Sequence, residues 1–208
     1  MSYITLMIND SGAVAAADTR ESFYHFAHFD WLRKAYLMEG RKLVCCLCGP
    51  SFRHGVPIFK TAAAILRANH GGMEAQLERI GRLVAAATAL RLPKEDPGPF
   101  VLLAAEWNGS GFDVYHFSVV HGKSKLVHTK TQPGKPVSLH AGAWHREMPR
   151  LSPDSLRDLS TDQLIDTARQ RVELAIEMDA ERRKRNPKHN QTIGGRVMTC
   201  AVRIKKPE

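Results

Sequence analysis

The sequence lacks several features that define common classes of protein. No apolar stretch in its 208 residues reaches the roughly 18 residues that suggest a membrane-spanning helix. The start has no basic segment followed by an apolar one, so no secretion signal is expected and the predicted location is cytoplasmic. Neither a Walker-type phosphate loop nor a Gly-x-Ser-x-Gly elbow is present. An unfolding ATPase that acted with this protein would therefore be a separate chain.

Cysteine is scarce, and three of the four cysteines lie in one apolar run, residues 43–49. In a β-strand, Cys46 and Cys48 would share one face while Cys45 points to the other. Metal ligands must converge on one point, so this alternation predicts buried, unpaired thiols and neither a metal site nor a disulfide framework. No metal or other cofactor is expected.

Basic residues outnumber acidic ones, 30 to 21, which gives a formal net charge of +9. Part of the excess lies in Arg182–Arg185 and in Lys205–Lys206. Cations are favoured near the C-terminus of a helix, so the first run is interpreted as a solvated helix end. No aromatic residues interleave with these cations and no nucleic-acid-binding motif is present, so a nucleic-acid partner is not expected.

Otherwise the composition is typical of a globular protein, with 43% hydrophobic and 25% charged residues. The length suits one domain, predicted to span residues 1–208. Helical periodicity predicts helices over about residues 56–69 and 73–92, and Ser160 is a typical N-cap for a third helix. Strands are predicted at residues 100–107, 112–120, 126–131 and 197–204.

The first twenty residues have the pattern of a β-hairpin. Two short apolar runs, residues 1–8 and 13–17, flank Asn9-Asp10-Ser11-Gly12, a cluster typical of tight turns. Ser2 becomes the amino-terminal residue if the initiator Met is removed. Its hydroxyl would then be a nucleophile, and its own α-amine, with an unperturbed pKa of about 8, a base. The second strand would return Asp18 to the neighbourhood of Ser2.

Lys34 is the candidate cation beside these two residues, and a third strand would have to bring it there. An ammonium group near the terminal amine would disfavour protonation of that amine and lower its pKa towards neutrality. Asp18 would keep Lys34 charged and in place. The three residues together would form an activated amino-terminal nucleophile.

This pattern resembles the proteasome β-subunit family of N-terminal nucleophile (Ntn) hydrolases. With Ser2 at the place of the family's N-terminal threonine, Gly12, Asp18 and Lys34 match without a gap. After one inserted residue, the next apolar strand resembles the one that ends in the family's oxyanion-hole glycine, here Gly49.

The resemblance implies an α+β fold, the four-layer αββα sandwich of two antiparallel sheets flanked by helices. The segment Thr192-Ile-Gly-Gly195 resembles bacterial proteasome homologues, the Anbu-type branch in particular. The catalytic residues implied by the resemblance are Ser2, Asp18, Lys34 and Gly49. The implied substrate-binding residues are Glu21, Ser22, Leu32 and Leu47. The implied supporting residues are Arg20, Asn190 and Thr192.

Two positions depart from the family pattern. Ala143, in a turn predicted at residues 139–145 after a loop at 133–136, stands where the family has a serine that hydrogen-bonds the terminal amine. The family's aspartate in the loop before the last strand has no acidic match, and Asn190 or Asn186 is its nearest substitute. Asparagine can hold a hydrogen bond but supplies no negative charge.

Three functions remain open. The first is a proteasome-like N-terminal serine peptidase that cleaves unfolded peptides inside a ring or helical homo-oligomer. The second is an Ntn amidase acting on a small amide, which an open monomer or dimer would favour. The third is a non-catalytic proteasome-like assembly subunit, in which a retained Met1 would block Ser2.

Overall fold

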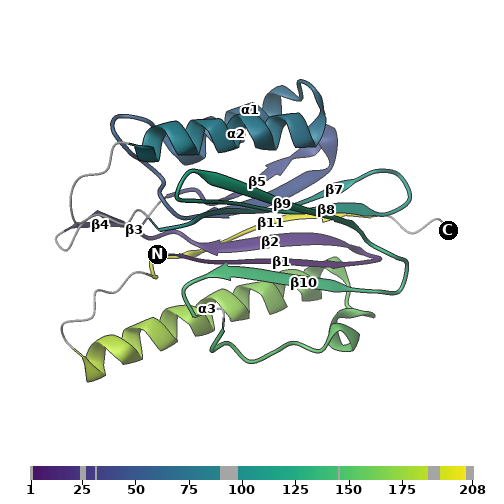
Figure 1. Cartoon of the computed structure of the whole chain (residues 1–208). Helices are drawn as coiled ribbons and strands as arrows, with labels where there is room; N and C mark the ends of the chain where they lie inside the picture. Colours follow the sequence, from purple (N-terminus) through teal and green to yellow (C-terminus); the bar gives the residue numbers. More distant parts are fainter. Residues whose placement is uncertain are drawn as a thin grey trace.

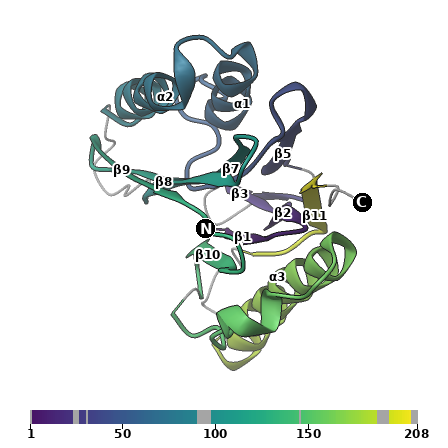
Figure 2. The same cartoon turned by 90° about the vertical axis from the view of Figure 1, so that its right-hand side faces the viewer.

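Two main β-sheets lie face to face between layers of helix in the computed structural model of the chain (Figures 1 and 2). The structure describes residues 2–23, 27–30, 32–89, 98–144, 146–186 and 193–204. Neighbouring strands within each sheet are antiparallel. The α+β sandwich with αββα layers predicted from the sequence is therefore confirmed.

The strands of the two sheets come from different parts of the chain. The four-stranded sheet has the order β10 (Val137–Gly142), β1 (Tyr3–Asn9), β2 (Gly12–Asp18), β11 (Val197–Arg203). The five-stranded sheet has the order β5 (Ala35–Met38), β6 (Leu43–Cys48), β7 (Phe100–Trp107), β8 (Phe112–Val120), β9 (Lys123–Lys130). A separate two-stranded ribbon consists of β3 (Glu21–Phe23) and β4 (Ala27–Phe29).

Each sheet carries helices on its outer face (Figure 2). α1 (Ile58–Ala68) and α2 (Gly72–Ala89) cover the five-stranded sheet, and α3 (Thr161–Arg185) covers the four-stranded one. Two short 3₁₀ turns are η2 (Glu39–Arg41) and η3 (Pro153–Leu156). None of the helices in the described part of the chain is both long and apolar enough to span a membrane.

The predicted amino-terminal hairpin is confirmed. Asn9 pairs with Gly12 at the turn, and Ile4 pairs with Ala17 at the open end. The Asn9 amide nitrogen donates to the carbonyl oxygens of Leu156 and Leu159, both at 2.7 Å, which fixes the turn against the segment before α3. The register brings the end of β2 next to the start of β1.

The cysteines also follow the predicted alternation. Cys45 faces the core under α1 and α2, whereas Cys46 and Cys48 face the core between the two sheets. All four cysteines are free thiols. Burial raises the pKa of Cys45 and Cys48 to about 12, so neither is a thiolate nucleophile near neutral pH.

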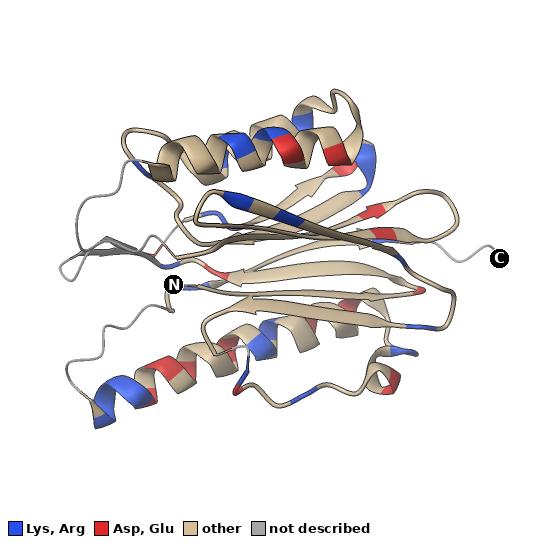
Figure 3. Ribbon diagram, in the orientation of Figure 1, with Lys and Arg blue, Asp and Glu red and all other residues tan. Residues whose placement is uncertain are grey.

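The long helix α3 begins at a complete capping box. The Ser160 hydroxyl accepts from the Gln163 backbone N–H at 3.3 Å, and the Gln163 side chain accepts from the Ser160 N–H at 2.8 Å. At the other end of the helix, the exposed cations of residues 182–185 lie at the same end of the molecule as the amino terminus (Figure 3). This basic run is solvated, as predicted.

Two strands differ from the prediction. β10 occupies residues assigned to a turn, because its partner is β1, more than a hundred residues away, and the local sequence gave no strand signal. β9 begins at Lys123 rather than residue 126, because it is an exposed edge strand whose first residues are polar. α1 is shorter than predicted at both ends, and α2 begins at Gly72, one residue before its predicted start.

The packing of α3 predicts a strong effect of one truncation. Leu164 is fully buried between this helix and the four-stranded sheet. Leu164→Ala should lower the free energy of unfolding by about 2–5 kcal/mol, because it removes buried methyl groups and leaves a cavity. Urea unfolding would measure the change, with the exposed Gln170→Ala on the same helix as control. Equal stability of the two variants would contradict this packing.

Candidate active site

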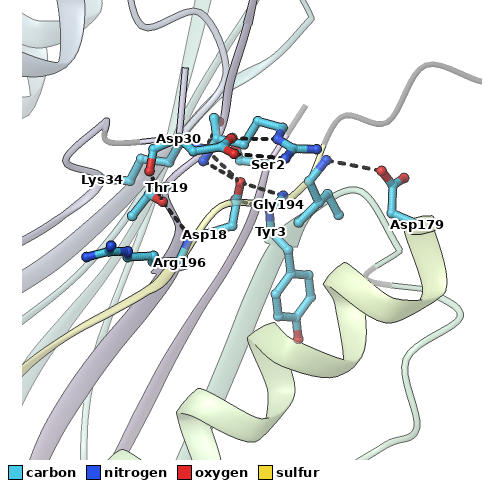
Figure 4. Close-up of polar contacts among 11 residues, drawn as sticks. Ser2, Tyr3, Asp18, Thr19, Asp30, Lys34, Asp179, Gly194 and Arg196 are labelled. Atoms are coloured by element: carbon cyan, nitrogen blue, oxygen red, sulfur yellow. Dashed lines mark hydrogen bonds and ion pairs between the residues drawn. The ribbon is translucent and has the colours of Figure 1, made fainter. Parts of the chain in front are cut away.

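Ser2, Asp18 and Lys34 meet where the two sheets come together (Figure 4). The Lys34 Nζ donates to Ser2 Oγ at 2.7 Å and to Asp18 Oδ2 at 3.0 Å. Ser2 and Asp18 flank the open end of the β1–β2 hairpin in the four-stranded sheet. Lys34 immediately precedes β5 of the five-stranded sheet. The predicted nucleophile, acid and cation are thus in direct contact.

All three side chains are almost excluded from solvent. The exposed fractions are 5% for Ser2, 0% for Asp18 and 1% for Lys34. A buried ammonium group needs partners for its three N–H bonds. Besides Ser2 and Asp18, Lys34 donates to the Arg20 carbonyl oxygen, so its donors have three acceptors. Lys34 is therefore held in one position beside the hydroxyl.

Asp18 accepts backbone hydrogen bonds in addition to its ion pair. The Tyr3 N–H donates to Oδ1 at 3.0 Å, and the N–H groups of Arg20 and Gly194 donate to Oδ2 at 3.2 and 3.4 Å. Burial raises the pKa of Asp18 above its usual value, and the opposing effects of Lys34, Tyr3 and Gly194 offset only part of that rise. These contacts join the acid to the start of β1 and to the segments just after β2 and just before β11.

The Ser2 backbone is held by the turn that follows β10. The Ala143 N–H donates to the Ser2 carbonyl oxygen at 2.9 Å. Gly142, just before it, has φ +99°, and a Cβ there would overlap the Ser2 carbonyl group. Only glycine fits this approach. The segment at Ala143 therefore contacts the amino-terminal region through its backbone, without the serine hydroxyl that the family has there.

Arg20, predicted to support the site, belongs to a second ion pair. Its Nε and Nη2 donate to the two carboxylate oxygens of Asp30 at 2.7 and 3.0 Å, and these bonds raise the pKa of Arg20. The Thr19 hydroxyl donates to the Asp30 carbonyl oxygen at 2.7 Å and accepts from the Arg196 N–H at 2.8 Å. Sequence reasoning gave no role to Thr19, which lies between Asp18 and Arg20 of the matched segment, or to Asp30, which lies outside the matched residues.

Gly49, the predicted oxyanion-hole residue, follows β6 with φ +113°. A Cβ at this position would collide with the backbone of Pro99 and Phe100, so glycine is required here. The strand end lies close to Lys34, whose carbonyl oxygen accepts from the Leu47 N–H at 2.8 Å. In the described part of the chain, no hydrogen bond joins Gly49 to Ser2, and its catalytic role remains a prediction.

The predicted substrate-binding residues lie in different surroundings. Leu32 lines a cavity of about 360 Å³ between the approach to β5 and α1. Leu47 is fully buried in the core under the helices, so it exposes no surface to a substrate in this structure. Glu21 and Ser22 lie on β3, paired with residues 29 and 28 of β4. The predicted supporting residues Asn190 and Thr192 fall outside the described residues.

Asp179, on α3, is a further buried acid that sequence reasoning did not identify as a candidate site residue. Its side chain is 1% exposed, and its oxygens accept from the Trp144 indole N–H at 3.0 Å and the Ile193 N–H at 3.2 Å. A charged residue at a core position of a helix was the signal that could have drawn attention to it.

Among solved structures, the chain is similar to Anbu (ancestral beta-subunit) from Yersinia bercovieri, with a TM-score of 0.60. The match covers 97% of this chain and 82% of that one, at 18% sequence identity. This chain has the Anbu fold. No family model matches the sequence, and no curated protein matches it.

The Anbu fold confirms the predicted proteasome-type Ntn-hydrolase architecture. At this level of identity the likeness concerns the fold, so the chemistry has to be argued from the side chains. On the Anbu framework, this chain places a serine hydroxyl within hydrogen-bond distance of a buried Lys–Asp pair. Among the described residues, no three His, Cys, Asp or Glu side chains gather as a metal site. The arrangement is suited to nucleophilic attack by an activated hydroxyl.

The ion pair at this site predicts a coupled effect on stability. Lys34→Met should lower the free energy of unfolding by about 3–5 kcal/mol, because it leaves the buried Asp18 carboxylate without its cation. The double variant Asp18→Asn with Lys34→Met should recover most of this loss, because no buried charge remains unpaired. Urea unfolding of both variants and of Asp18→Asn completes the cycle. Additive effects of the two substitutions would contradict the coupling.

Proposed function

We propose that the protein is a proteasome-like N-terminal serine peptidase. The observation that carries this proposal is the contact of Lys34 Nζ with both Ser2 Oγ, at 2.7 Å, and Asp18 Oδ2, at 3.0 Å. A hydroxyl nucleophile next to its own α-amine as base, with a Lys–Asp pair beside both, is an arrangement that supports amide hydrolysis. Ser2 acts once it has become the amino-terminal residue.

In the proposed mechanism, Ser2 Oγ attacks the carbonyl carbon of a peptide bond. Its proton passes to the Ser2 α-amine, directly or through one water molecule. The Lys34 ammonium favours the neutral, basic form of that amine by charge repulsion, and Asp18 holds Lys34 in place through its ion pair. The Lys34 ammonium also donates to Ser2 Oγ and so stabilises negative charge that develops on the attacking oxygen.

Attack gives a tetrahedral intermediate whose oxyanion accepts a hydrogen bond from the Gly49 N–H. The next residue is Pro50, which has no N–H to offer, so the glycine is the backbone donor at this strand end. When the intermediate collapses, the C–N bond breaks and the leaving amine takes the proton from the α-amine. Water then hydrolyses the ester between Ser2 and the acyl fragment and restores the free hydroxyl.

Assembly belongs to the proposal as well. Subunits of this fold, arranged as a ring or helical homo-oligomer, would enclose the site in a chamber that admits only unfolded peptides. We propose a cytoplasmic protein that acts alone or with a separate ATPase chain.

One observation favours a non-catalytic assembly subunit as the second candidate. The Ser2 side chain is almost covered in this structure, with an exposed fraction of 5%. A peptidase requires that a substrate carbonyl reach Ser2 Oγ, so the covering atoms would have to be removed or displaced. The state of the amino terminus therefore separates the two candidates.

The peptidase proposal predicts that purified protein with Met1 removed hydrolyses fluorogenic peptides. Ser2→Ala should abolish this turnover, because it removes the attacking oxygen, whereas Ser2→Thr should retain a large part of it. Mass spectrometry of the intact protein would verify removal of Met1. It would also detect one covalent adduct on Ser2 after treatment with an electrophilic peptide inhibitor. Undiminished turnover by Ser2→Ala would refute the mechanism.

The cavity beside Leu32 is the proposed pocket for the side chain that precedes the cut. Tyr36 and Phe59 give it apolar walls, and the cations Arg33, Lys60 and Arg67 also line it. Within the described residues, none of these three cations forms an ion pair. Unneutralised positive charge around one cavity attracts acidic side chains and repels basic ones.

This cavity predicts a preference for acidic side chains that reversing one of its charges would weaken. Peptides with Glu before the cut should be cleaved faster than those with Lys. Arg67→Glu should reduce the ratio of the two kcat/KM values by about tenfold, since a partly exposed charge contact contributes up to about 1 kcal/mol for each peptide. Lys135→Glu, in the loop before β10, carries the same charge change away from the cavity and serves as control. If the ratio of the two kcat/KM values were the same in Arg67→Glu and Lys135→Glu, the cavity beside Leu32 would be excluded as the pocket for this side chain.

A further inference from the structure

Asp179 lies near the end of α3 (Figure 4). Its side chain is buried, with an exposed fraction of 1%. Its two carboxylate oxygens have different partners. Oδ1 accepts from the Trp144 indole N–H at 3.0 Å, and Oδ2 accepts from the Ile193 backbone N–H at 3.2 Å. One side chain of α3 therefore binds two segments that are about fifty residues apart in the sequence.

The first of these segments leads directly to Ser2. Trp144 follows Ala143, whose N–H donates to the Ser2 carbonyl oxygen at 2.9 Å. Trp144 has φ +67°, a left-handed conformation that bulky side chains rarely adopt. Such backbone persists only where the surroundings fix it. Here the indole N–H is bound by Asp179, and the guanidinium of Arg182 lies 5.0 Å from the centre of the ring.

The second segment leads directly to Asp18. Gly194 follows Ile193, and its N–H donates to Asp18 Oδ2 at 3.4 Å while its carbonyl oxygen accepts from the Arg20 N–H at 3.1 Å. The Arg20 guanidinium packs so closely on Gly194 that a Cβ there would overlap it. The position of this segment therefore affects both the acid of the site and the residue whose carbonyl oxygen accepts from Lys34.

We propose that Asp179 is a positioning residue that fixes the distance between Ser2 and Asp18 by tying both segments to α3. It contacts none of the reacting atoms, and it acts through Trp144 on the Ser2 backbone and through Ile193 on Gly194 and Asp18. Its consequence for catalysis rests on the proposed peptidase function, whereas its effect on the two segments does not.

The chemistry of the two donors explains why this position holds an acid. An indole N–H and a backbone N–H approach the same side chain, and a carboxylate offers an acceptor to each. Asparagine of the same shape offers one acceptor and one NH₂ group, so one of the two donors would face another donor. Because the site is buried, water has little access to replace the lost acceptor.

Amide hydrogen exchange, followed by NMR, tests the contacts without reference to activity. In Asp179→Asn, the amides of Ala143, Ile193 and Gly194 should exchange at least tenfold faster than in the wild type. Asp166→Asn is the matched control, because it removes an exposed carboxylate from the same helix, where Asp166 pairs with Arg169 at 3.0 Å. Unchanged exchange at these amides in Asp179→Asn would overturn the proposal.

A second variant keeps the test decisive if Asp179→Asn fails to fold. Trp144→Phe retains an aromatic ring beneath Arg182 and removes the indole N–H donor, together with part of the ring. The Ala143 amide should then exchange faster, while the Gly194 amide, held through Ile193, should keep its protection. Equal protection of Ala143 in this variant and in the wild type would contradict the role of the Trp144 contact.

Kinetic measurements test the effect of Asp179 on catalysis separately. In Asp179→Asn, kcat should fall about tenfold with little change in KM, because the nucleophile is displaced while the substrate pocket is not. The acid limb of the pH profile should move to higher pH, because a weaker Gly194 hydrogen bond raises the pKa of Asp18. If the wild type showed no turnover, the proposed peptidase function would be refuted. The exchange data would still show whether Asp179 holds the two segments. Normal kcat in Asp179→Asn with an active wild type would overturn the positioning role.

Discussion

The buried ion pair between Lys34 and Asp18 is the interaction on which the site depends. Each partner comes from a different sheet, so the 3.0 Å contact joins the two layers at one end of the sandwich. Neither charge is stable there alone, because desolvation of an isolated ion exceeds what the surrounding backbone dipoles return. The pair therefore fixes how the sheet ends meet, and Ser2 is placed beside it by the register of the β1–β2 hairpin.

Local sequence signals predicted that Asp18 returns to Ser2, whereas a family resemblance predicted that Lys34 lies beside both. The turn cluster at residues 9–12 and the flanking apolar runs determine the hairpin and thus the return of Asp18 to Ser2. Lys34 has no local signal, since it reaches Ser2 only through the packing of two sheets. β10 was missed for a related reason: its strand character comes from pairing with β1 across the length of the chain. Asp179 likewise reads as an ordinary helix position until Trp144 and Ile193 are placed around it.

The environment of Ser2 combines order with restricted access. Its hydroxyl, its carbonyl group and its neighbours Tyr3 and Asp18 are all hydrogen-bonded to different segments. Such fixation favours catalysis, because a nucleophile already in position loses little entropy when it attacks. The same fixation leaves Ser2 only 5% exposed. The contacts that hold Ser2 in place therefore also restrict the access of a substrate to its hydroxyl. Whether a substrate can reach that hydroxyl depends on the atoms next to the amino terminus.

Because residue 2 is a serine and not a threonine, the surrounding groups have to orient its hydroxyl. Threonine has a β-methyl group that restricts χ1, whereas the Ser2 hydroxyl is free to rotate unless a partner holds it. Here the Lys34 ammonium is that partner, and Lys34 is itself held by Asp18 and the Arg20 carbonyl oxygen. The charges behind them alternate: Asp30 raises the pKa of Arg20 most strongly, and Asp18 and Asp179 add to that effect. Asp179 adds a further carboxyl group from α3 behind Arg20, and this hydrogen-bonded network supplies the orientation that the missing methyl group would have given.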